Sequence, residues 1–147
     1  MNSVIQKIEN IVNALQSGFE SERHVVAEIY HKLRNCGLVN FDQIRLECPY
    51  PMKENRKCDI FIDRGLGIWI EVKAYFKHET PNTRSGKHTH DKSKPNKACD
   101  DLMKIRKGKK LMIIYQDIDY EPIKYPWSTI ESKCKNNDII FIRKVAE

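Results

Sequence analysis

Three residues near the ends of two apolar segments have the types that metal-assisted phosphodiester chemistry needs. Glu71 and Lys73 close the segment Gly67–Lys73, and Asp59 lies in the preceding segment, Lys57–Asp63. Side chains alternate between the two faces of a β-strand, so Glu71 and Lys73 share one face. Carboxylates are the ligands that hard divalent cations prefer, and a nearby amine can stabilise negative charge.

The residues between these two segments predict a hairpin. Asp63–Gly67 contains two glycines, which tolerate the positive φ of a tight turn. If the hairpin is centred on Gly65, Asp59 lies directly across from Glu71, with Cβ atoms roughly 5 Å apart. Carboxylates this close repel each other unless a positive charge lies between them. A divalent cation would supply that charge, and Lys73 would help.

The same residues are also compatible with an exposed hairpin face that carries an ordinary Glu–Lys pair. A Glu-x-Lys triplet alone is weak evidence, because it occurs by chance in most proteins. Its position favours a functional interpretation. Glu71 ends an Ile/Trp/Val run where a half-buried strand normally carries uncharged residues, and Asp59 is flanked by Cys58 and Ile60.

Length and composition are typical of an ordinary globular protein. The chain has 147 residues, of which 40% are hydrophobic and 31% charged, so we expect one domain over residues 1–147. No segment approaches the roughly 20 apolar residues of a membrane span. Five cysteines without a CxxC pair indicate reduced thiols and a cytoplasmic protein. The net charge of +6 favours a polyanionic partner.

The positive charge is concentrated in residues 77–97, which lack apolar periodicity and predict a long loop next to the proposed site. We expect its basic residues to bind nucleic acid, although a solvated loop without a special role is an alternative. The motif His88-x-His90-Asp91 offers metal ligands, but no fourth ligand lies nearby in sequence. The basic residues are Lys77, Arg84, Lys87, Lys92, Lys94 and Lys97.

Two amphipathic helices are predicted before the strands. The first covers about residues 3–16, and the second opens with a capping box at Ser17–Glu20 and ends before Gly37. Glu22 lies on the apolar stripe of the second helix, which suggests a role for an inward carboxylate. Glu28 lies off that stripe and is expected to be solvated.

The remaining pattern predicts a sheet with two further helices. Asp100 and Asp101 are expected to form helical ion pairs with Lys104. The apolar run Leu111–Tyr115 is typical of a strand at the centre of a sheet. The predicted strands cover residues 43–48, 57–63, 67–73, 111–115 and 138–142, and the helices begin near residues 93 and 126.

In this order, the elements and acids resemble the PD-(D/E)XK nuclease superfamily, which has the restriction-endonuclease-like fold. The resemblance covers about residues 17–116 and rests on Lys-Cys-Asp-Ile-Phe-Ile followed by Ile-Trp-Ile-Glu-Val-Lys. Gly18-x-x-x-Glu22-Arg23 is also similar to the opening helix of archaeal-type Holliday-junction resolvases. Cys58 departs from the family, because it stands where the name-giving proline would be.

The resemblance implies an α/β fold with a mixed sheet: an αβββαβ core, with an extra N-terminal helix and a C-terminal helix and strand. It implies a Mg²⁺- or Mn²⁺-dependent endonuclease, with DNA favoured over RNA as substrate. Asp59, Glu71 and the Val72 carbonyl would hold the metal ion. Lys73 would orient the attacking water, and Glu22 would hold a water, a second ion or Lys73 itself.

Two other classes of protein remain open. One is a nucleic-acid-binding or scaffold module that keeps the fold without catalysis, although intact Asp59, Glu71 and Lys73 disfavour it. The other is an interaction protein, such as an immunity protein or toxin partner, whose acids form a salt-bridged face. The pattern does not choose between duplex, junction and single-stranded substrates, nor does it establish whether the protein acts as a homodimer.

Overall fold

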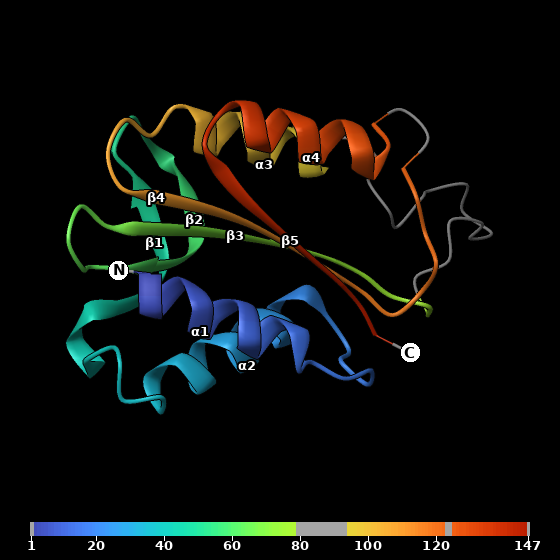
Figure 1. The fold of residues 1–147 in the computed structure, drawn as a ribbon, viewed down its shortest axis with the longest axis horizontal. Coiled ribbons are helices and arrows are strands. Elements are labelled where there is room, and N and C mark those ends of the chain that lie inside the picture. The colour runs from blue at the N-terminus through green and yellow to red at the C-terminus, as the bar shows by residue number, and fades with distance from the viewer. Residues whose placement is uncertain (1, 79–93, 123–124, 147) are drawn as a thin grey trace.

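The computed structural model describes residues 2–78, 94–122 and 125–146. Figure 1 shows three layers, with α3 and α4 on one face of a five-stranded sheet and α1 and α2 on the other. The helices are α1 (Asn2–Asn13), α2 (Glu22–Arg34), the short 3₁₀ helix η1 (Phe41–Gln43), α3 (Lys94–Met103) and α4 (Trp127–Asn136). The strands are β1 (Ile44–Tyr50), β2 (Lys53–Ile62), β3 (Ile68–Tyr75), β4 (Lys109–Gln116) and β5 (Ile139–Val145).

The strands lie side by side in chain order, β1-β2-β3-β4-β5. β1, β2 and β3 are antiparallel, whereas β3, β4 and β5 are parallel to one another. Parallel neighbours need a crossover connection, and α3 and α4 lie in the two crossovers. The mixed sheet with helices on both faces agrees with the predicted α/β class.

Each face of the sheet buries its own apolar cluster. Ile68, Ile70 and Val72 of β3 pack towards α1 and α2, whereas Trp69 packs towards α3 and α4. This alternation was predicted, and it places Glu71 and Lys73 on the same strand face as Trp69. The residues from Leu111 to Tyr115 are fully buried, as expected for a central strand.

The predicted start of the second helix was wrong. The capping residue is Ser21 and not Ser17: Ser21 has an extended backbone, and its hydroxyl accepts a hydrogen bond from the His24 N–H at 3.2 Å. The helix therefore begins at Glu22, which lies in its first turn. Phe19 precedes the helix and packs edge-on against Tyr115, with ring centroids 5.4 Å apart.

The predicted ion pairs with Lys104 were also wrong, because both aspartates of α3 pair with other elements. Asp101 binds Arg56 of β2, and Asp100 binds Lys133 of α4 at 2.6 Å. These contacts connect α3 to the sheet and to its neighbouring helix.

All five cysteines are free, which agrees with the prediction of reduced thiols. Among the helices of the described ranges, none is both long enough and apolar enough to span a membrane.

Candidate functional site

The candidate site lies where β2 and β3 separate. Ile60 pairs with Ile70 and Ile62 with Ile68, so the hairpin is centred on Gly65 as predicted. The ladder ends at Ile60 and Ile70, however, and Asp59 forms no ladder pair with Glu71. Beyond this pair the two strands separate and form a fork. Side chains, and not backbone groups of β2, occupy the open edge of β3 there.

Two carboxylates supply hydrogen-bond acceptors to the open edge of β3. Asp59 Oδ2 accepts a hydrogen bond from the Val72 N–H at 2.7 Å, and Glu22 Oε2 accepts one from the Ala74 N–H at 3.0 Å. The N–H and C=O of one strand residue point to the same edge, so the Val72 carbonyl also faces the fork. Glu22 reaches this edge because Ser21 starts α2 beside it.

Glu71 is the most deeply buried acid of the site. Its residue is 5% exposed, and its Oε1 accepts a hydrogen bond from the Tyr50 hydroxyl. Burial and the charge of Asp59 raise the pKa of Glu71 to about 8. Burial likewise raises the pKa of Asp59, and the charge of nearby Glu22 adds to this effect. At neutral pH the raised pKa favours the protonated form of Glu71, which reduces its repulsion with Asp59.

Lys73 is surrounded by these acids. Its Nζ lies 3.7 Å from Glu22 Oε1 and 3.9 Å from Glu71 Oε2. Burial alone would lower the pKa of Lys73, but the charges of Glu22, Glu71 and Asp59 outweigh it and raise the pKa above its ordinary value. Lys73 is therefore a cation at neutral pH.

Asp59 lines a pocket on each face of the sheet. The pocket on the α2 side has a volume of about 450 Å³, and the pocket on the α3 side about 320 Å³. The α2-side pocket is lined by Glu22, Arg23, Val26, Ala27, Leu46, Glu47 and Asp59. The α3-side pocket is lined by Asn55, Arg56, Lys57, Asp59, Glu71, Lys73, Lys97, Ala98 and Asp101.

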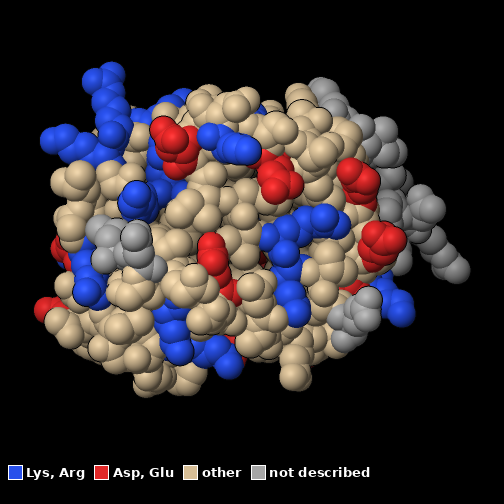
Figure 2. All heavy atoms as spheres, in the orientation of Figure 1, with Lys and Arg blue, Asp and Glu red and all other residues tan. Residues whose placement is uncertain are grey.

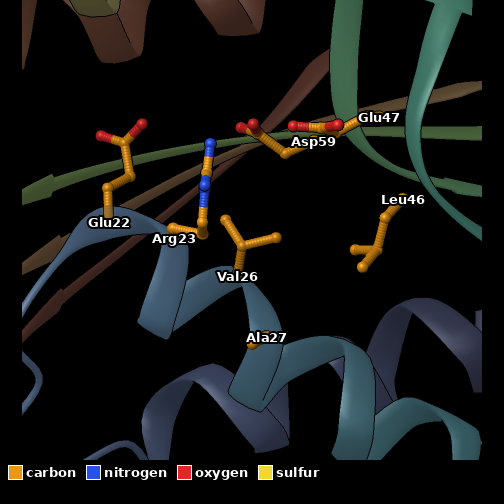
Figure 3. A pocket seen from close by; sticks show the side chains of 7 residues that line it. All are labelled: Glu22, Arg23, Val26, Ala27, Leu46, Glu47 and Asp59. Carbon is orange, nitrogen blue, oxygen red and sulfur yellow. The ribbon is translucent and has the colours of Figure 1, made fainter.

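Figure 3 shows the α2-side pocket from close by. Glu22 and Arg23 extend from the start of α2 towards the sheet, and Arg23 points into the space between Glu22 and Asp59. Glu47 lies beside Asp59, because the β1–β2 register places residue 47 opposite residue 59. The pocket thus combines three carboxylates with one guanidinium.

Sequence reasoning assigned no role to Arg23, Glu47 or Tyr50. Arg23 directly follows Glu22, so its position in the first turn of a helix was a usable signal. Tyr50 could not be placed, because the β1–β2 register shifts between Pro49 and Tyr50. Glu47 has a φ of 52°, an unusual backbone that sequence alone does not reveal for a glutamate.

The predicted nucleic-acid-binding residues are only partly within the described structure. Lys97 is exposed and lines the α3-side pocket, while Lys77 is exposed after the end of β3. Lys94 is the first residue of α3. Arg84, Lys87 and Lys92 lie outside the described residues, as do His88, His90 and Asp91.

The donors at the fork fit a hard divalent cation held partly by water. Within the described ranges, no group of three or more His, Cys, Asp or Glu side chains could hold a metal ion. The predicted set has only two carboxylates, Asp59 and Glu71, together with the Val72 carbonyl. Mg²⁺ typically binds one or two carboxylates and keeps several waters, so this small set is sufficient. A cation bound there would offset the repulsion between the two carboxylates.

Comparison with known proteins gave no relative: no family model matches the chain, and no curated protein matches it significantly.

Proposed function

We propose that this protein is a Mg²⁺- or Mn²⁺-dependent nuclease of the PD-(D/E)XK superfamily, with a restriction-endonuclease-like core. Its substrate is nucleic acid, DNA in preference to RNA. The observation that carries the proposal is the convergence of Asp59, Glu71 and Lys73 at the fork between β2 and β3, where Asp59 binds the Val72 N–H. The sequence resemblance implies functional residues at these same positions.

The α3-side pocket is the better entrance for a phosphate. Its lining contains four cations, Arg56, Lys57, Lys73 and Lys97, and three carboxylates. A metal ion bound by Asp59 and Glu71 would lower the pKa of a bound water and offset charge on the phosphate. The charge of Glu22 helps to keep Lys73 protonated, so its ammonium can bind a phosphate oxygen and orient the attacking water.

Tyr50 and Glu22 position the reacting groups. The Tyr50 hydroxyl fixes Oε1 of Glu71, which leaves Oε2 directed towards Lys73. Glu22 binds both the Ala74 N–H and Lys73, so it holds the lysine close to the edge of β3. Such supporting contacts keep catalytic side chains in one rotamer.

Cleavage assays test the activity. Labelled duplex DNA, single-stranded DNA, a four-way junction and RNA are incubated with Mg²⁺, Mn²⁺ or EDTA. We expect metal-dependent cleavage by the wild type and none by Lys73→Ala, which should keep its fold and its affinity for nucleic acid. Lys32→Ala, an exposed control on α2, should cut normally. Cleavage in EDTA would refute the metal requirement, and an unfolded Lys73→Ala would make Lys73 structural.

Calorimetry with Mn²⁺ tests the metal site directly. We expect Asp59→Ala and Glu71→Ala each to weaken binding at least about tenfold, as losses around metal sites commonly do. Asp63→Ala is the control, because Asp63 lies in the same hairpin but pairs with Arg45 at the surface. Equal affinities in the wild type and both site variants would favour the alternative, a salt-bridged interaction module.

A further inference from the structure

A second concentration of positive charge lies in the turn between α3 and β4. We call residues 104–110 the basic turn, because this segment of seven residues has five cations and no acid. The cations are Lys104, Arg106, Lys107, Lys109 and Lys110. All are exposed except Lys110, which is half-buried with its Nζ bonded to the Ile105 carbonyl.

The cations of the basic turn have no anionic partners in the described part of the chain. Arg45, Arg56 and Lys133 each bind an aspartate, whereas no ion pair within the described ranges involves the basic turn. Unpaired like charges repel one another and destabilise the folded state unless an anion binds them. The arrangement therefore points to a polyanionic ligand.

The basic turn is held rigidly against the β2–β3 hairpin. Gly108 has a φ of 96°, and a Cβ at this position would lie 2.5 Å from the Gly67 carbonyl oxygen. The Lys109 N–H donates to that same oxygen at 2.8 Å, and the Ile105 side chain is buried. Because the backbone of the turn is already fixed, ligand binding has to order only its side chains.

One stripe of α3 connects the basic turn to the α3-side pocket. Lys97, Asp101 and Lys104 are spaced by four and three residues, so they follow one face of α3 and its C-terminal end. Lys97 and Asp101 line the pocket, and Arg56 neutralises Asp101. At a rise of 1.5 Å per residue, Lys104 lies roughly 10 Å along the helix axis from Lys97.

The distribution of positive charge on the surface agrees with this connection between the basic turn and the α3-side pocket. Figure 2 shows Lys and Arg side chains gathered at the upper left, where Figure 1 places the connection from α3 to β4. The spacing of about 10 Å exceeds the axial rise of about 3.4 Å per phosphate on one strand of a duplex, so the two ends of this stripe would contact different phosphates.

We propose that the basic turn binds the phosphate backbone of a nucleic-acid duplex, at phosphates other than the one that would occupy the α3-side pocket. The location of that second phosphate rests on the proposed nuclease function. Binding of nucleic acid to the basic turn does not require cleavage. The proposal assigns the path of the nucleic acid to the α3 side of the sheet, along α3 and across the end of the β2–β3 hairpin.

Two triple variants with equal loss of charge test the proposal. The turn variant carries Lys104→Gln, Arg106→Gln and Lys107→Gln. The control carries Lys7→Gln, Lys32→Gln and Lys144→Gln, which lie on α1, α2 and the α1-facing side of β5. Affinity for a short labelled DNA duplex is measured in EDTA over a range of NaCl concentrations. We expect the turn variant to reduce the slope of log affinity against log salt by roughly 2 to 3, at about 0.9 for each phosphate that is no longer neutralised, and the control to match the wild type.

Equal slopes for the two folded variants would overturn the proposal, as would a wild type that does not bind duplex DNA. Binding to anionic phosphatidylserine vesicles that depends on the turn, without DNA binding, would assign the turn to membranes and also overturn it. The proposed nuclease function is tested separately, by cleavage. A turn-dependent slope without cleavage supports this proposal and contradicts the nuclease, whereas cleavage with equal slopes does the reverse.

Discussion

The Glu71 carboxyl is buried between Tyr50 and Asp59, and its pKa of about 8 connects the site to the pH dependence of folding. In the unfolded chain this group ionises near its ordinary pKa of 4.5. Between these two pH values the folded protein therefore binds more protons than the unfolded chain. Because of this group, stability is greatest below about pH 4.5 and falls as the pH rises through 8.

We expect Glu71→Gln to remove much of this dependence, because a neutral amide needs no proton. The free energy of unfolding in EDTA is measured with urea at several pH values between 5 and 8.5. The wild type should lose stability relative to Glu71→Gln as the pH rises. Asp63→Asn is the control and should follow the wild type, since Asp63 is exposed. Parallel curves for the wild type and Glu71→Gln would show that Glu71 is ionised throughout.

The positions of Asp59, Glu71 and Lys73 could be predicted from the sequence, because the two-residue period of a strand and a glycine-rich turn fix both face and register. The bond between Arg56 and Asp101 could not be predicted, because these residues are 45 positions apart and belong to different layers. The hydrogen bond between Tyr50 and Glu71 could not be predicted for a different reason: a register shift at the end of β1 interrupts the strand pattern.

At the scale of elements, the start of α2 determines what Glu22 can reach. The sequence pattern placed Glu22 on the correct helix but began that helix at Ser17, since the residues Ser17–Glu20 also match a capping box. Ser21 competes for the same role and is the residue that caps the helix. Its position leaves Glu22 in the first turn, in contact with Lys73 and the Ala74 N–H.

We therefore expect Glu22→Gln to reduce cleavage by about tenfold or more, because Lys73 loses a charged partner. Glu28→Gln is the matched control on the same helix. Glu28 pairs only with Lys32 within the described residues, at 3.7 Å, and should change the rate little. Single-turnover rates at saturating protein separate this effect from binding. Equal rates for the two variants would leave Glu22 without a role in the chemistry.

The contact between the α3–β4 turn and the β2–β3 hairpin permits a second comparison. Gly108→Ala should be more destabilising than Gly37→Ala, although both glycines have a positive φ. Backbone strain costs about 1–3 kcal/mol at either position. Only at Gly108 does a new Cβ meet backbone, which adds about 1–3 kcal/mol. Urea unfolding measures both values, and equal losses would mean that the turn shifts away from Gly67 without cost.

At the scale of the whole molecule, positive charge is concentrated at two places on the chain, the basic turn and the segment 77–97 that precedes and enters α3. If both bind the backbone of one nucleic acid, their contributions to the salt dependence should add. We expect Lys87→Gln, Lys92→Gln and Lys94→Gln together to reduce the slope by roughly 0.9 for each phosphate released, and to do so equally with and without the turn substitutions. A slope unchanged by the first triple would make residues 77–97 a solvated segment.

The kind and sequence of most helices and strands could be predicted, because hydrophobic periodicity changes from two residues in strands to between three and four in helices. The fork could not be predicted, since nothing in the alternating pattern of β2 indicates where it leaves β3. The candidate site lies at the point where β2 separates from β3.

The fork also makes two backbone amides of β3 unusual. The N–H groups of Val72 and Ala74 are held by the Asp59 and Glu22 carboxylates. Their exchange with deuterium therefore depends on single side chains, whereas amides held by neighbouring strands exchange only when the sheet opens. NMR should show faster exchange at Val72 in Asp59→Ala and at Ala74 in Glu22→Ala, with each change confined to its own amide. If either substitution accelerates deuterium exchange at both amides, the open edge of β3 moves as one unit. Each amide is thus a native probe of one carboxylate.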